Sequence, residues 1–173
     1  MLEFAGGTGI WTEYLARRAR RLLVLDASPA MLRKNQERLA VKGLLPRVRY
    51  EQADLFAWRP NHAFDAAYSS FWVSHIPADR LDAFFSVAAA ALRPGGTFVI
   101  LESQPARPRA PGQGTKRVDN DVEIRTLNDG VTYRIVKREM HAEELAASLE
   151  RAGFAASFRK TATHFLLMIG TKR

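Results

Sequence analysis

The first hundred residues alternate between short apolar runs and longer stretches whose apolar positions recur with helical spacing. The run Leu22-Leu23-Val24-Leu25 has no polar residue, which is typical of a strand buried on both faces of a parallel sheet. Apolar runs of this kind predict five strands, at residues 1–4, 22–25, 47–52, 64–69 and 97–101. The intervening stretches predict helices at residues 10–19, 28–42 and 77–92. Such alternation favours a parallel sheet with helices on both faces.

The last seventy residues change this rhythm. Residues 104–115 are rich in proline, arginine and glycine and predict a loop, and the turn Asn128-Asp129-Gly130 predicts a hairpin of residues 122–127 and 131–137. A helix at residues 141–152 and two antiparallel strands at 154–161 and 164–170 follow. With no internal repeat, we expect one domain, 1–173, in which 104–137 form a variable loop and hairpin insertion near the substrate site.

Composition narrows the classes of protein that need considering. The 173 residues include no cysteine, which excludes disulfides, thiolate catalysis and cysteine-ligated zinc, and the four histidines show no metal-ligand spacing. We therefore expect no metal. No apolar stretch is long enough to span a membrane and no signal peptide is evident, so we expect a cytoplasmic protein. The net charge of +8 permits a nucleic-acid partner, but we interpret the arginine clusters as solvated helix faces, because no aromatic residues that could stack on bases are interleaved with them.

A glycine-rich turn follows the first strand and precedes the first helix. Leu2-Glu3-Phe4-Ala5-Gly6-Gly7-Thr8-Gly9 lets the backbone approach a ligand closely, and Asp26 ends the second strand 17 residues after Gly9. A carboxylate there can accept hydrogen bonds from both hydroxyls of a ribose. A dinucleotide site requires a small third residue where Thr12 stands, and Glu3 suits a cationic ligand better than a pyrophosphate.

These residues resemble the first motif of the class I S-adenosylmethionine-dependent methyltransferases, E/D-x-G-x-G-x-G, through Glu3, Ala5, Gly7 and Gly9. Ala5 departs from the usual glycine, and we expect a slight change in turn geometry from it. The resemblance implies a Rossmann-like α/β fold: a mostly parallel seven-stranded sheet of order 3-2-1-4-5-7-6, helices on both faces and an extra β-hairpin. It also implies S-adenosyl-L-methionine as the cofactor.

The resemblance further implies the cofactor-binding residues. Glu3 and the turn residues Ala5, Gly6, Gly7 and Gly9 would lie near the methionine part, and Asp26 with Ala27 would bind the ribose. Asp54 would meet the adenine amino group, with the Leu55 amide on the ring, and Ser70 and Phe71 would lie beside the methionine. From the residues alone, Asp26 could instead cap the following helix, and Asp54 could be a turn acid.

The acceptor site is expected around residues 71–77. His75 is the candidate general base, although it could merely bond a backbone group, and Trp72 could line the pocket or the core. Tyr133 and Arg134 could close over a substrate, or simply pair within the hairpin. Ser69-Ser70-Phe71-Trp72 stands where RNA and protein methyltransferases carry a sequence such as N-P-P-Y, which favours a small-molecule acceptor over those alternatives.

The chain starts only two residues before Glu3, whereas the family usually has one or two helices before this strand. We therefore expect an open pocket, an exposed apolar patch where such helices would pack, and a tendency to form a homodimer through it. A cofactor-binding module with little turnover is the corresponding alternative function.

Overall fold

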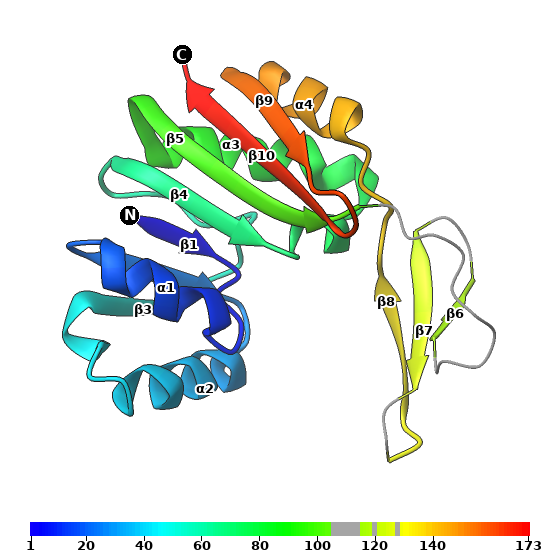
Figure 1. Ribbon diagram of the computed structural model, residues 1–173, viewed down its shortest axis with the longest axis horizontal. Helices are drawn as coiled ribbons and strands as arrows, with labels where there is room; N and C mark the ends of the chain where they lie inside the picture. The colour runs from blue at the N-terminus through cyan, green and yellow to red at the C-terminus, as the bar shows by residue number, and fades with distance from the viewer. Residues whose placement is uncertain (105–114, 119–120, 127–128) are drawn as a thin grey trace.

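The computed structural model describes residues 1–104, 115–118, 121–126 and 129–173, and it centres on a seven-stranded sheet (Figure 1). The strand order is β3-β2-β1-β4-β5-β10-β9, with the first five strands parallel and β10 antiparallel to both β5 and β9. The predicted order 3-2-1-4-5-7-6 is therefore confirmed. The strands are β1 Leu2–Phe4, β2 Leu22–Asp26, β3 Val48–Gln52, β4 Phe64–Ser70, β5 Leu92–Ser103, β9 Phe154–Lys160 and β10 Phe165–Lys172.

Within the part of the chain that the structure describes, four α-helices cover the sheet in two layers (Figure 1). α1 Ile10–Arg18 and α2 Pro29–Ala40 lie over one face of β1–β3, and α3 Leu81–Ala91 and α4 Ala142–Arg151 pack together over the other face. The predicted Ser28 cap is present, since its side chain accepts a hydrogen bond from the Met31 amide at the start of α2. None of the helices in the described ranges is both long and apolar enough to cross a bilayer.

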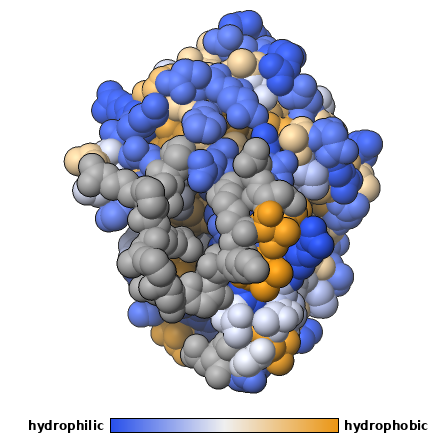
Figure 2. Space-filling model, turned by 90° about the vertical axis from the view of Figure 1, so that its right-hand side faces the viewer, coloured by the Kyte–Doolittle hydropathy of each residue, from blue (hydrophilic) through white to orange (hydrophobic). Residues whose placement is uncertain are grey.

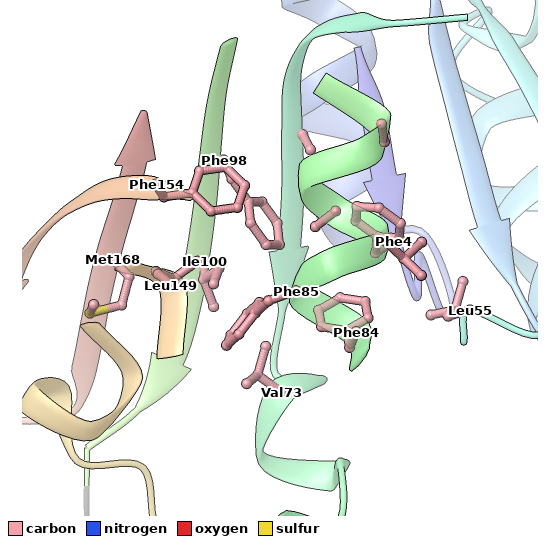
Figure 3. Packing of buried hydrophobic residues seen from close by; sticks show 14 of the residues in the cluster. Phe4, Leu55, Val73, Phe84, Phe85, Phe98, Ile100, Leu149, Phe154 and Met168 are labelled. Carbon is pink, nitrogen blue, oxygen red and sulfur yellow. The ribbon is translucent and has the colours of Figure 1, made fainter. Parts of the chain in front are cut away.

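The larger core lies between the sheet and the α3–α4 layer (Figure 3). Phe4 of β1 packs its ring 5.3 Å from Phe84 of α3 and 5.9 Å from Phe98 of β5. Because neighbouring side chains of a strand point to opposite faces, Leu2 and Phe4 enter this core while Glu3 points to the α1–α2 side. Val73, in the 3₁₀ turn η2 Val73–His75, is also fully buried there, which anchors the loop after β4.

A second, three-stranded sheet is formed by β6 Thr115–Arg117, β7 Val122–Thr126 and β8 Thr132–Val136. It lies beyond the carboxyl ends of the parallel strands (Figure 1). The predicted hairpin is confirmed as β7 and β8, but β6 begins within the predicted loop, at its last residue. Of that loop, residues 105–114 lie outside the described residues, as do residues 127–128. On this side of the molecule, hydrophilic residues cover most of the visible surface and apolar ones form small patches (Figure 2).

One predicted boundary differs from the structure. The sequence predicts that residues 92–96 form a turn between a helix and a strand, whereas β5 already begins at Leu92, which pairs with Phe64. The register then shifts, so that Thr97 pairs with Ala66. Pro94 cannot donate to the ladder and Gly95 takes a φ of 75°, and together they form an irregularity within the strand rather than a separate turn.

Candidate active site

The glycine turn after β1 places three residues, Ala5, Gly7 and Gly9, in left-handed backbone conformations at alternate positions. Gly9 must be glycine on steric grounds as well, because a Cβ there would lie 2.6 Å from Asn35 Oδ1. A Cβ on Gly6 would lie 2.4 Å from Val24 Cγ1 of β2. At Ala5 the φ of 53° costs an alanine of order 1 kcal/mol, so the expected effect of this replacement is local backbone strain.

Glu3 is a buried carboxyl group beside this turn. Its side chain is 1% exposed, and Oε2 has no hydrogen-bond partner within the described residues. Burial raises the pKa of Glu3 to about 8; the hydrogen bond to the Thr12 side chain opposes this rise, and the charge of Asp26 adds to it. A buried acid with an unbonded oxygen is costly, and is therefore suited to a ligand that supplies a donor or a positive charge.

Asp26 ends β2 and binds the glycine turn directly. Its Oδ2 accepts the Gly7 amide at 2.9 Å, and its Oδ1 accepts the Ser28 amide at 2.8 Å, next to the start of α2. Asp26 thus bonds the residue that caps α2, while the cap itself is the Ser28 side chain. A carboxylate has about four acceptor positions, so both oxygens can still accept a further hydrogen bond each.

Asn35 supports the glycine turn, although no motif in the sequence predicts this contact. Its Nδ2 donates to Thr12 Oγ1 at 2.8 Å and to the Gly6 carbonyl at 3.3 Å, and its Oδ1 accepts from the Tyr50 hydroxyl at 3.0 Å. Asn35 thus connects α2 and β3 to the glycine turn. The available signal was a polar residue on the apolar side of the predicted helix, level with Leu32 and Leu39.

The other predicted cofactor residues follow the ends of β2, β3 and β4. The Ala53 amide donates to the Asp26 carbonyl at 3.1 Å, which places the segment after β3 beside Asp26. Asp54 Oδ1 accepts the Phe56 amide at 2.9 Å, as the turn-acid alternative requires, and the Leu55 side chain lies in the core. Ala27 is exposed, and its carbonyl accepts from Gln52 Nε2.

Ser70 ends β4, and the loop after it carries Phe71, Trp72 and His75. Since β1 pairs with β4 and aligns Phe4 with Ser69, Ala5 and Ser70 leave their strands side by side. Phe71 takes a φ of 53°, a strained conformation for an aromatic residue, and its ring contacts Phe165 of β10 at 5.9 Å. Trp72 is half-buried and packs against the core, with its ring 6.4 Å from that of Phe56.

The partner of His75 Nδ1 indicates which ring nitrogen carries the proton. Its Nδ1 lies 2.7 Å from the Val136 carbonyl oxygen. Because a carbonyl only accepts, Nδ1 must carry the proton, and Nε2 of the neutral ring keeps its lone pair. Burial and then the positive charge of Lys137 lower the pKa of His75, which favours this neutral form. The backbone bond that we considered as an alternative therefore exists, and it leaves the lone pair of Nε2 available.

Tyr133 and Arg134 lie on β8, where they pair with Arg125 and Ile124 of β7. Tyr133 is 51% exposed, and neither side chain is seen in contact with the glycine turn. Ordinary hairpin pairing accounts for their present positions. Trp11, at the start of α1, lies with its ring 6.0 Å from Tyr68 of β4, the strand next to Glu3.

Comparison with known proteins agrees with this geometry. The family model described as "Methyltransferase domain" matches residues 1–96, which include the glycine turn, Asp26, Asp54 and the loop of His75. The chain belongs to this family. The class I methyltransferase resemblance inferred from Glu3, Gly7 and Gly9 is thereby confirmed.

Two curated relatives are ubiquinone/menaquinone biosynthesis C-methyltransferases. That of Enterobacter sp. (strain 638) is 30% identical over 165 residues, 88% of this chain, and that of Teredinibacter turnerae is 32% identical over 106 residues, 59% of it. The chain spans 65% and 42% of their respective lengths. Among solved structures, the DhpI–SAM–HEP complex superposes with a TM-score of 0.79 at 30% identity, covering 98% of this chain and 76% of DhpI.

Proposed function

We propose that this chain binds S-adenosylmethionine at the glycine turn and transfers its methyl group to a small-molecule acceptor. The observation that carries the proposal is the buried, unbonded Oε2 of Glu3 beside a turn in which Gly6 and Gly9 leave no room for a Cβ. A cationic amino-acid group is the ligand that such a carboxyl favours, and S-adenosylmethionine has one. DhpI has been solved with SAM, which supports the same choice of ligand here.

The cofactor residues take the following proposed roles. Glu3 binds the ammonium group, and the turn residues Ala5, Gly6, Gly7 and Gly9 lie near the methionine part, where their small size lets the ligand approach the backbone. Asp26, with Ala27, binds the ribose hydroxyls through the acceptor positions that Gly7 and Ser28 leave open. Asp54 and the Leu55 amide contact the adenine, and Ser70 and Phe71 border the methionine part.

The acceptor side is proposed to lie between the loop after β4 and the β6–β8 sheet. When bound, S-adenosylmethionine would supply a methyl group on a sulfonium. A lone pair of the acceptor would form a bond to the methyl carbon while the carbon–sulfur bond breaks in line, and S-adenosylhomocysteine would leave as a neutral thioether. His75 Nε2 takes the proton that an oxygen or nitrogen acceptor loses. Trp72, Tyr133 and Arg134 are proposed to contact the acceptor, since β8 joins the loop of His75 through Val136.

The class of acceptor, the cellular location and the assembly of the protein are also proposals. The two curated relatives are C-methyltransferases of quinone biosynthesis, which favours a small organic acceptor over RNA or protein. A cytoplasmic location, one domain over residues 1–173 and a homodimer remain proposals of the same kind. Phe158 and Phe165, each 40% exposed, provide part of the apolar surface that a dimer would cover.

Calorimetric titration with S-adenosylhomocysteine tests the cofactor site, and absence of both binding heat and a thermal shift would refute it.

Turnover is measured as S-adenosylhomocysteine formed from S-adenosylmethionine with hydroxyl, amine and activated-carbon acceptors. His75→Gln is expected to lower kcat by roughly 10²-fold or more with oxygen or nitrogen acceptors while leaving S-adenosylhomocysteine affinity unchanged. His164→Gln, at an exposed histidine before β10, is the matched control. An active His75→Gln variant would exclude the base.

A further inference from the structure

Three consecutive residues at the end of β8 bind the turn that carries His75. The Val136 carbonyl accepts from His75 Nδ1 at 2.7 Å, Lys137 Nζ donates to Ser74 Oγ at 2.6 Å, and the Arg138 amide donates to the Ser74 carbonyl at 2.8 Å. These contacts join residues about sixty positions apart in the chain. The β6–β8 sheet is therefore joined to the loop after β4 at His75 and its neighbour Ser74.

A buried carboxyl holds the same turn from the other side. Glu102, near the end of β5, is fully buried, and its Oε1 accepts the Ser74 amide at 3.1 Å. The amide, carbonyl and hydroxyl of Ser74 are thus all hydrogen-bonded, and Val73 is fixed in the core. Burial raises the pKa of Glu102, and the hydrogen bond from the Ser74 amide and the charge of Lys137 oppose that rise. A turn held at so many points leaves the adjacent ring little freedom.

We propose that Lys137 is a positioning residue for His75: by binding Ser74 it keeps the Val136 carbonyl against Nδ1, so that Nε2 is the basic atom of the ring. The proposal rests on the proposed role of His75 as general base. Lys137 itself acts through Ser74 and through its charge, and it takes no part in proton transfer. An imidazole held in the wrong tautomer would present an N–H where the acceptor must deliver a proton.

The charges around His75 act in both directions. Lys137 and Arg125 disfavour the imidazolium, whereas Glu123 of β7 favours it, and Glu102 lies against Lys137 from β5. Since Lys137 is the largest of the charge effects on the pKa of His75, removing its ammonium is expected to raise that pKa. Lys137→Arg keeps the charge, and Lys137→Met keeps most of the stem without it.

Nuclear magnetic resonance of histidine labelled in its ring nitrogens tests this without any cofactor or acceptor. His75 is assigned by its loss in His75→Gln. In the wild type at high pH we expect the Nδ1–H tautomer. In Lys137→Met we expect the His75 titration curve to move to higher pH, and in Lys137→Arg we expect it to stay near its wild-type position. Ser74→Ala, which keeps the charge but removes the acceptor of Lys137, is expected to disturb the tautomer.

Two results would overturn the proposal: an Nε2–H tautomer in the wild type, or a His75 titration that is identical in Lys137→Met and the wild type. The tautomer of the wild type can be measured without any variant, so an Nε2–H tautomer would overturn the proposal even if Lys137→Met fails to fold. Where an acceptor is known, Lys137→Met should lower kcat more than it changes KM, and the acid limb of the pH profile should move to higher pH. Because the resonance assay requires neither ligand nor turnover, its failure is distinguishable from failure of the proposed methyl transfer.

Discussion

Replacing Glu3 with glutamine is expected to stabilise the protein alone at alkaline pH while removing its affinity for S-adenosylhomocysteine. The two effects have one cause. Glu3 is buried with an unbonded oxygen, which makes its negative charge costly in the protein alone and useful once a cationic ligand binds. A residue that served only to hold the fold would instead lose stability and binding together.

The magnitude follows from the pKa of Glu3, about 8 in the folded protein against a usual value of 4.5. Between these values the folded protein keeps a proton that the unfolded chain has released, so the free energy of unfolding falls as pH rises through this window. About 3.5 pKa units at ~1.36 kcal/mol each give a loss of roughly 5 kcal/mol, complete above pH 8.

Glutamine cannot ionise and avoids that loss, but its amide adds a buried donor that costs about 1–3 kcal/mol. The net gain at pH 9 is therefore roughly 2–4 kcal/mol, which raises Tm by roughly 4–16 °C for a chain of this size. At pH 5.5 Glu3 is still protonated in most folded wild-type molecules, so no gain is expected from Glu3→Gln.

Thermal unfolding at pH 5.5 and pH 9, with and without S-adenosylhomocysteine, measures both effects. At a ligand concentration a hundred times Kd, the wild type should gain ~2.7 kcal/mol, and Glu3→Gln should gain little. Glu37→Gln, at an exposed position of α2, makes the same chemical change away from the buried site and should alter neither property. A Glu3→Gln protein that is destabilised at pH 9, or that binds the ligand like the wild type, would refute the reasoning.

Three further predictions follow from the same geometry. Because a bound ammonium lowers the pKa of Glu3 from about 8, S-adenosylhomocysteine should bind more tightly as pH rises from 6 to 7.5, with proton release detectable by calorimetry in buffers of different ionisation enthalpy. Gly6→Ala should lower Tm and abolish binding, since its Cβ would meet Val24 Cγ1 at 2.4 Å; wild-type affinity would contradict this. Phe84→Ala should cost about 3–5 kcal/mol in denaturant unfolding, and a cost below 1 kcal/mol would contradict the packing around Phe4 and Phe98.

The sheet could be predicted from the sequence because its signals are local. Apolar runs such as Leu22–Leu25 are long enough to identify buried strands, and helices of ordinary length separate them, so the chain has few other ways to fold. Glu3 and Asp26 could be predicted because each stands at the end of such a strand, and strand ends meet at one edge of a parallel sheet. The structure shows both carboxyls at the glycine turn.

The remaining features depend on contacts that spacing along the chain does not encode. In the sequence Lys137 is one of many basic residues and simply follows a predicted hairpin. Only the fold places it next to Ser74, 63 residues away in the chain. Asn35 contacts Thr12 and the glycine turn in the same long-range manner. The irregular start of β5 was missed for a different reason: Pro94 and Gly95 are typical of turns, and pairing with β4 keeps them within a strand.

Glu3 and Glu102 are buried on opposite sides of the sheet, and they differ in whether the fold supplies a partner for their charge. Glu102 lies on the α3–α4 side, where Lys137 and the Ser74 amide offset its burial. Glu3 lies on the α1–α2 side, and within the described residues no lysine or arginine contributes to its pKa. The partners of Glu102 are thus built into the fold, although burial still raises its pKa and its Oε2 has no hydrogen-bond partner within the described residues. Glu3 has no such built-in cation, so at neutral pH it is expected to ionise when a cationic ligand arrives, which couples the charge of Glu3 to cofactor binding.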